Sequence, residues 1–148
     1  MFWNRGGGVL TGTLTGVSVD ATLEASAGLT YADDLTLYVT PTDALLFGGT
    51  LQVGGFSNLS AANRFSWANG GSEIPGTVVQ DSIDLSALSI DGATHAFWIG
   101  NGYGFTGASG TWSGTLTLHG IDAVPAPGAL AVLALGGLAT RSRRRLRA

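Results

Sequence analysis

Carboxylates are the side chains of this chain with the most direct route to chemistry, because two of them at a fixed separation can hydrolyse a glycosidic bond. Of the ten acidic residues, only Glu24 and Glu73 are glutamates, and neither belongs to a recognisable motif. Asp81 and Asp84 flank the start of an expected strand, where aspartate commonly satisfies the backbone of a turn. A polysaccharide hydrolase that uses Asp81 and Asp84 is therefore the third hypothesis for function, and we expect no catalytic site.

Three further aspartates, Asp33, Asp34 and Asp43, are close enough in sequence to offer oxygen ligands to Ca²⁺. They lack the spacing of an EF-hand loop, and turn chemistry is the stronger interpretation. The chain has no cysteine, and its two histidines, His95 and His119, are distant in sequence. The absence of cysteine excludes a thiolate metal site, and two distant histidines do not form a zinc-binding pattern. We expect no cofactor, with calcium as a weak alternative.

Aromatic residues gather in the second half of the chain, and Trp98, Tyr103 and Trp112 are candidate glycan-binding residues. An exposed aromatic ring on a β-sandwich can stack on a sugar ring. Alternation places Phe97 and Ile99 on one face of their expected strand and Trp98 on the other. Tyr103 lies in a glycine-rich loop, where binding residues often occur. Core packing is the competing interpretation for each aromatic residue.

The charges are unevenly distributed along the chain. All seven basic residues are arginines, and five of them lie in residues 141–148. Residues 1–140 carry two arginines against ten acidic groups, a formal charge of −8. Nucleic-acid binding requires clustered cations on the binding face, so an acidic body argues against it.

The last 25 residues, Val124 to Ala148, divide into a proline-rich entry, an apolar run and a basic end. Proline is tolerated in the first turn of a helix, so a helix can begin near Gly128. We expect a transmembrane helix at about 128–140, which is short for a bilayer but sufficient with snorkelling arginines. Clustered arginine is retained on the cytoplasmic side, which places the body outside. The basic stop consists of Arg141, Arg143, Arg144, Arg145 and Arg147. A buried core helix with a basic end is the alternative.

This three-part tail resembles the PEP-CTERM sorting signal that exosortases process in Gram-negative and related bacteria. The matching residues are Val124, Pro125 and Pro127, followed by the apolar run and the arginines, and Ala126 stands where the family usually has glutamate. The resemblance covers only the tail. It implies export, retention in the membrane, cleavage near the proline motif and release or attachment at the cell surface. The implied partners are an exosortase-type enzyme and the membrane, and the implied location is the cell envelope.

The export route that this resemblance implies requires a signal peptide at the other end of the chain. Residues 1–5 lead directly into Gly6-Gly7-Gly8 without the apolar segment of a signal peptide. Two expectations follow. Either the N-terminus is truncated, and part of the domain with it, or the tail anchors the protein by another route.

Between the ends, apolar and polar residues alternate with the period of β-strands. Val17, Val19, Ala21, Leu23 and Ala25 form one apolar face, and Leu35, Leu37 and Val39 form another. The expected strands are 17–25, 35–40, 50–53, 64–68, 82–85, 94–99 and 111–119. Tight turns are expected at Asn69-Gly70-Gly71, Asp91-Gly92 and Asn101-Gly102. The repeated Gly-Thr-Leu-Thr at 12–15 and 114–117 suggests that the first and last strands are neighbours.

These patterns predict an all-β antiparallel β-sandwich, jelly-roll or immunoglobulin-like, over residues 1–122. One short C-terminal hydrophobic helix follows within the sorting tail, 123–148. The main hypothesis is an exported, non-catalytic protein of the cell surface or extracellular matrix. The alternative is a carbohydrate-binding module that recognises an extracellular polysaccharide.

Overall fold

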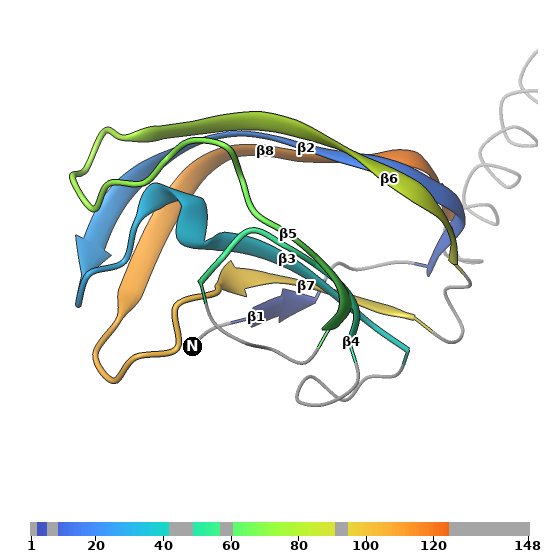
Figure 1. Ribbon diagram of the computed structural model, residues 1–148, viewed down its shortest axis with the longest axis horizontal. Helices are drawn as coiled ribbons and strands as arrows, with labels where there is room; N and C mark the ends of the chain where they lie inside the picture. Colours follow the sequence, from blue (N-terminus) through green and yellow to red (C-terminus); the bar gives the residue numbers. More distant parts are fainter. Residues whose placement is uncertain (1–2, 6–8, 42–48, 57–60, 91–94, 125–148) are drawn as a thin grey trace, which may run out of the picture.

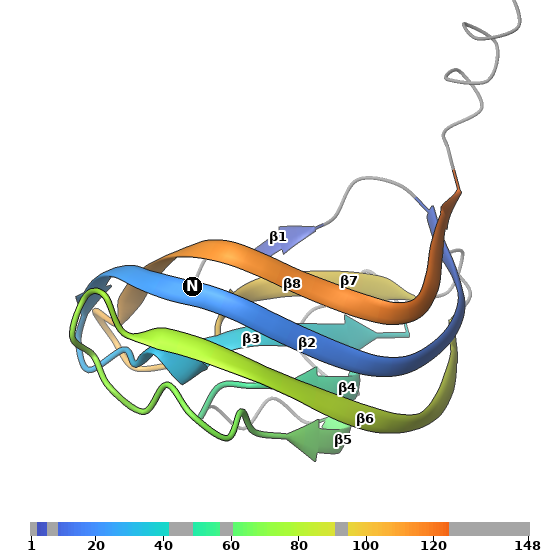
Figure 2. The same cartoon turned by 90° about the horizontal axis from the view of Figure 1, so that it is seen from above.

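The computed structural model describes residues 3–5, 9–41, 49–56, 61–90 and 95–124, which form two packed β-sheets (Figures 1 and 2). The elements in chain order are β1 (Trp3–Arg5), β2 (Val9–Ala27), the 3₁₀ turn η1 (Ala32–Asp34), β3 (Leu35–Thr40), β4 (Gly49–Val53), β5 (Ala61–Phe65), β6 (Val78–Ile90), β7 (Ala96–Asn101) and β8 (Ser109–Val124). In Figure 1 the long strands β2, β6 and β8 arch over the smaller strands of the other sheet.

The prediction of an all-β sandwich is confirmed at the level of two packed sheets. One sheet has five strands in the order β1-β7-β3-β4-β5, and the other has three in the order β6-β2-β8. Neighbouring strands are antiparallel except for β4 and β5, which pair in parallel. The expectation of a purely antiparallel sandwich is wrong at that pair. Parallel neighbours need a crossover connection rather than a hairpin, which local alternation does not reveal.

The three-stranded sheet is built around β2, which is 19 residues long. It pairs with β8 on one side, Val19 lying opposite Leu116, so the neighbours suggested by the repeated tetrapeptide are confirmed. The sequence predicted shorter strands here. Glycine ends many strands, but Gly12 and Gly114 lie inside β2 and β8 with positive φ. Register shifts near such residues bend a strand without ending it.

The core lies between the sheets and follows the predicted alternation. Val17, Val19, Ala21 and Leu23 are buried on β2, as are Leu35, Leu37 and Val39 on β3. Each fully buried valine or leucine contributes about 1.5–3 kcal/mol. Ala25 was expected on this apolar face, but it is exposed because the β2–β8 register shifts between Leu23 and Ala25.

Strand β3 departs from the predicted pattern on its other face. Thr36, Tyr38 and Thr40 alternate with the apolar residues and are also fully buried. Successive side chains of a strand point to opposite faces of the sheet, so both faces of this central strand are covered. A period-2 pattern alone predicts only one buried face.

Two of the expected tight turns are instead parts of longer connections. Asn69-Gly70-Gly71 lies within the segment that joins β5 to β6, and Asn101-Gly102 begins the segment that joins β7 to β8. Both connections change sheets, so they cannot close hairpins. A glycine pair permits a reversal, but packing between the sheets decides which strand follows. Asp91-Gly92 lies outside the described residues.

The strand expected at 64–68 is displaced toward the N-terminus, where β5 ends at Phe65. Trp67 leaves the sheet and donates its indole N–H to the carbonyl oxygen of Leu35 at 2.8 Å. Such a side-chain contact competes with continued strand pairing. The segment after β5 is therefore tied to the start of β3.

Several expectations fall on residues outside the described part of the chain. They are the helix at 128–140, Pro125, Ala126, Pro127, the arginine stop and Asp43. Val124, the first residue of the expected sorting motif, is the last residue of β8 and pairs with Val9. Within the described ranges, no helix has the length and apolar character needed to cross a bilayer.

Candidate functional site

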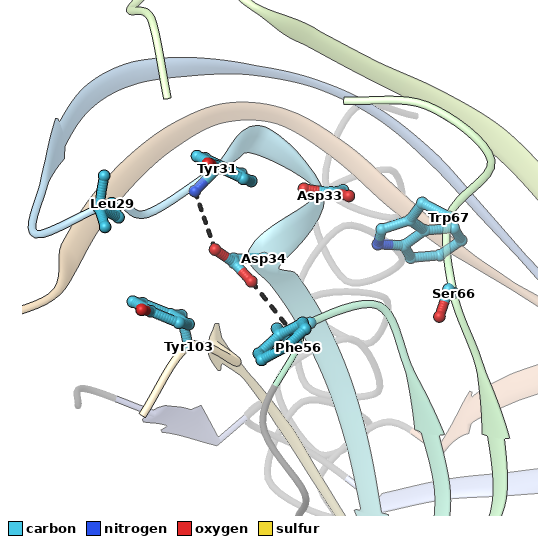
Figure 3. Close-up of a pocket in the computed structure, with 9 residues that line it drawn as sticks. Leu29, Tyr31, Asp33, Asp34, Phe56, Ser66, Trp67 and Tyr103 are labelled. Carbon is cyan, nitrogen blue, oxygen red and sulfur yellow. Dashed lines mark hydrogen bonds between the residues drawn. The ribbon is translucent and has the colours of Figure 1, made fainter. Parts of the chain in front are cut away.

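A pocket of about 300 Å³ opens at one end of the sandwich, where several connections between strands meet (Figure 3). This volume is at the lower limit for small-molecule sites, so the pocket suits a ligand of about one ring. Its lining combines aromatic, aliphatic and carboxylate side chains: Leu29, Tyr31, Asp33, Asp34, Gly55, Phe56, Ser66, Trp67 and Tyr103.

The carboxylate of Asp34 holds two walls of the pocket together. Its Oδ2 accepts a hydrogen bond from the Tyr31 amide at 2.8 Å, and its Oδ1 accepts one from the Phe56 amide at 3.2 Å. Its carbonyl oxygen accepts the Gly102 amide at 2.7 Å, one residue before Tyr103. Figure 3 shows Asp34 between Tyr31 and Phe56. Asp34 therefore positions side chains that come from three separate segments.

The backbone of Asp33 fixes one more segment and adds a second contact to the segment of Phe56. Its amide donates to the Gly70 carbonyl at 3.2 Å, and its carbonyl accepts the Gly55 amide at 2.9 Å. The short turn η1 thus contacts the connections that follow β4, β5 and β7. This network explains why residues far apart in sequence line one pocket.

Glycine is required where the chain leaves β4. Gly54 and Gly55 have φ values of +79° and +76°, a region that residues with a side chain rarely adopt. A Cβ on Gly55 would lie 2.1 Å from Thr36 Oγ1 and 2.8 Å from the Gly102 Cα. The two backbones therefore approach closely, which brings Phe56 and Tyr103 to the same rim.

The rim of the pocket is an aromatic surface exposed to solvent. Tyr103 lies between Phe56 and Phe105, with ring centroids 6.2 Å from each and interplanar angles of 59° and 24°. Phe56 is 79% exposed and Phe105 is 69% exposed. Large apolar side chains gathered on a surface commonly mark a binding site.

Leu29 adds a strained residue to the same rim. It is the only non-glycine residue with positive φ in the described part of the chain, at 62°, and it is 58% exposed. This conformation costs a residue with a Cβ roughly 1–2 kcal/mol. Backbone strain of this kind concentrates at functional sites, where the geometry is retained despite its cost.

Burial raises the pKa of both aspartates in the pocket above the ordinary aspartate value. For Asp33, loss of solvation is the largest cause, and a hydrogen bond from its own backbone amide partly opposes it. For Asp34, the same loss of solvation is opposed by the Tyr31 and Phe56 amides and reinforced by the charge of Asp33. No cationic side chain is among the residues that line the pocket in the described structure.

The three candidate glycan-binding residues are not brought together. Tyr103 lines the pocket. Trp112 is half-buried, and its indole N–H donates to the Ala32 carbonyl at 2.9 Å, so it supports η1 without lining the pocket. Trp98 is half-buried on β7, and its N–H contacts Thr40 Oγ1 at 3.3 Å. The pocket instead combines Tyr103 with two of the calcium candidates, Asp33 and Asp34.

The arrangement around Asp33 and Asp34 does not resemble a calcium site. Both oxygens of Asp34 accept backbone amides. The third candidate, Asp43, lies outside the described residues. Within the described segments, no three acidic or histidine side chains are grouped as metal ligands would be.

The proposed hydrolase pair is arranged for structural roles. Asp81 accepts the Ala68 amide at 2.7 Å and the Ser82 amide at 2.8 Å, which anchors the connection before β6. Asp81 and Asp84 are separated by three positions in a continuous register with β2, so their side chains point to opposite faces of the sheet. Two carboxylates on opposite faces cannot flank one glycosidic bond.

A serine and a histidine meet on the outer face of the three-stranded sheet. Ser18 Oγ lies 2.6 Å from His119 Nε2 and 2.9 Å from Ser82 Oγ. His119 points outward, as the alternation predicted, and is exposed. A nucleophile also needs oxyanion donors beside it, and the backbone amides of paired strands are used in the ladder. The pair is therefore best described as a surface hydrogen-bond network.

Sequence reasoning singled out Asp33, Asp34 and Tyr103 and missed the other six residues that line the pocket: Leu29, Tyr31, Gly55, Phe56, Ser66 and Trp67. Local signals existed for two of them. Tyr31 comes just before the Asp33-Asp34 pair, and Phe56 follows a Gly-Gly pair. Neither signal indicates that the two segments meet, because that depends on contacts between distant parts of the chain.

We found no match to this chain among protein-family models, curated protein sequences or solved structures.

Proposed function

We propose that this chain is an exported, non-catalytic β-sandwich that is displayed at the cell envelope and binds glycan through the pocket at its end. The observation that carries the binding function is the combination of an exposed aromatic rim with carboxylates inside a pocket of about 300 Å³. Aromatic rings stack on the apolar faces of sugars, and carboxylates accept hydrogen bonds from sugar hydroxyls.

The envelope location rests on the tail. Its proline entry, apolar run and arginine end support sorting by an exosortase-type enzyme, with a membrane helix at about 128–140. We include in the proposal the finer expectation that the sandwich belongs to the jelly-roll or immunoglobulin-like class. A role as a surface or matrix component without a ligand is the second candidate, favoured by the polar, exposed outer face of the three-stranded sheet.

The glycan function is tested by mutating Tyr103. Tyr103→Ala removes the ring that lies between Phe56 and Phe105, so we expect at least a tenfold loss of affinity on an array of bacterial and plant polysaccharides. Ile74→Ala is the matched control, because Ile74 is 68% exposed and lies outside the pocket. Circular dichroism of both variants verifies folding. A wild-type protein that binds no polysaccharide would remove the glycan function and leave the ligand-free surface role.

The sorting function is tested by deleting residues 125–148 from a chain expressed behind a signal peptide. We expect the full chain to fractionate with the envelope and the deletion variant to appear in the medium or periplasm, because the apolar run and the arginines are then lost. Replacing the five tail arginines with serine is the matched variant that keeps the apolar run. An unchanged distribution of the deletion variant would rule out a sorting role for the tail.

A further inference from the structure

The pocket carries negative charge, which binding of a neutral sugar does not require. Two of its lining residues are aspartates, and no lysine, arginine or histidine lines it among the described residues. Both carboxylates lose solvation there, which raises the free energy of their ionised forms. A ligand that carries a positive charge would compensate for that loss directly.

The two aspartates have different roles. The oxygens of Asp34 are engaged by the Tyr31 and Phe56 amides, so this residue holds the walls. Asp33 is half-buried and lines the pocket. A carboxylate has about four acceptor positions, so Asp33 keeps capacity for a ligand. Asp33 is thus the group of the pocket that can bind a cation.

The surrounding rings favour the same kind of ligand. Tyr31, Phe56 and Tyr103 line the pocket together with the buried indole of Trp67. The face of an aromatic ring attracts an ammonium group within about 6 Å. In Figure 3 Tyr31 lies on one side of Asp34, and Phe56 and Tyr103 lie on the other. An ammonium group in this space would meet aromatic faces as well as a carboxylate.

We propose that the pocket binds an amino sugar with a free ammonium group, its ring against Tyr103 and its ammonium on Asp33. The inference rests on the proposed glycan-binding function and narrows it to one class of sugar. An N-acetylated sugar lacks the charge, and a uronic acid carries a charge of the wrong sign. The partner would then be a deacetylated, cationic polysaccharide.

The test compares two probes that differ at the amino group, glucosamine tetramer with free ammonium groups and N-acetylglucosamine tetramer with neutral amides, in calorimetric titrations of the full chain near pH 6. We expect the glucosamine tetramer to bind about tenfold more tightly. Asp33→Asn should reduce its affinity to that of the acetylated tetramer. Tyr103→Ala should weaken binding of both probes.

General attraction between an acidic protein and a cationic oligosaccharide is controlled by Asp84→Asn. This variant removes the same charge from an exposed position on β6, outside the pocket. If Asp84→Asn weakens binding as much as Asp33→Asn does, the proposed site is wrong.

The outcomes separate this inference from the function on which it rests. If both tetramers bind equally and Asp33→Asn has no effect while Tyr103→Ala does, the pocket binds sugar without requiring an ammonium group, and this inference is overturned. If neither tetramer binds but another polysaccharide does, the amino-sugar assignment fails and glycan binding stands. If no glycan binds at all, both proposals fail.

Discussion

Asp33 and Asp34 are adjacent in sequence, yet their side chains have different roles in the folded protein. Asp34 is bound by two backbone amides and shapes the pocket, whereas Asp33 lines the pocket and keeps acceptor capacity. An ionised carboxylate that loses solvation destabilises the folded state. We therefore expect Asp33 to be a residue whose contribution to binding comes at the expense of stability.

Substitution of Asp33 should change how stability depends on pH. Burial raises its pKa above 3.8 in the folded state, so the folded protein binds the proton more tightly than the unfolded chain does. The associated stability is fully present below pH 3.8 and is lost as the pH rises through the raised pKa. Asp33→Asn removes this loss. Urea unfolding between pH 3 and pH 7 should show a shallower decline for the variant and greater stability than wild type at neutral pH.

The control for this prediction removes a charge elsewhere. Asp84→Asn changes the net charge by the same amount at an exposed position on β6. A pH profile of Asp33→Asn that coincides with the wild-type profile would show that burial of this carboxylate has no energetic consequence.

At the scale of elements, the short turn η1 organises the site because three connections bind to its backbone. The contacts are hydrogen bonds to Gly55, Gly70 and Gly102. Small residues at these points allow the connections to approach one another. Trp112 supports the same turn from β8 through the Ala32 carbonyl. The pocket walls therefore depend on a junction of elements rather than on one rigid strand.

The close approach at Gly55 should make this junction sensitive to a single methyl group. In Gly55→Ala, the new Cβ would lie 2.1 Å from Thr36 Oγ1 at a φ of +76°. We expect a loss of about 2 kcal/mol or more in the free energy of unfolding, because both overpacking and backbone strain apply. Gly71→Ala is the matched control, since no atom lies within 4 Å of its added Cβ. Chemical denaturation measures both, and equal stabilities for the two variants would contradict the proposed junction.

At the scale of the whole molecule, the two sheets share one core, and the pocket lies at its end. The core residues of β2 face those of β3, β4 and β7, so loss of packing anywhere in this layer affects the whole sandwich. The long strands of the three-stranded sheet cover the smaller sheet (Figure 1). Such a scaffold holds the connections between strands in fixed positions.

A cavity at the centre of this layer should lower stability far more than a change at the surface. Leu37 is 1% exposed, so Leu37→Ala is expected to cost about 2–5 kcal/mol. Ile74→Ala serves as the comparison, because Ile74 is 68% exposed and its truncation should cost about 0.5 kcal/mol or less. Thermal and urea unfolding give both values. Similar costs for the two variants would mean that the sheets are not packed through Leu37.

The sequence by itself determined the β character of this protein and much of its core. Alternation at Val17 to Leu23 and at Leu35 to Val39 identified buried faces correctly, because side-chain direction in a strand depends only on the parity of position. The failures were also physical. Ala25 left the apolar face at a register shift, and Thr36, Tyr38 and Thr40 are buried on the polar face of β3, because both faces of this strand are covered. Neither property is encoded in local periodicity.

Only the tertiary structure decided which residues form the pocket. Asp33, Asp34 and Tyr103 were noticed separately, as ligand and stacking candidates, but Tyr31 and Phe56 were not. These residues meet because the connection from β5 to β6 and the connection from β7 to β8 both cross between the sheets. In addition, the backbone of η1 forms hydrogen bonds with these connections. Such contacts join positions far apart in sequence, as between the Asp34 carbonyl and the Gly102 amide. Residue types indicate what chemistry each side chain can perform, whereas strand order and register decide which side chains perform it together.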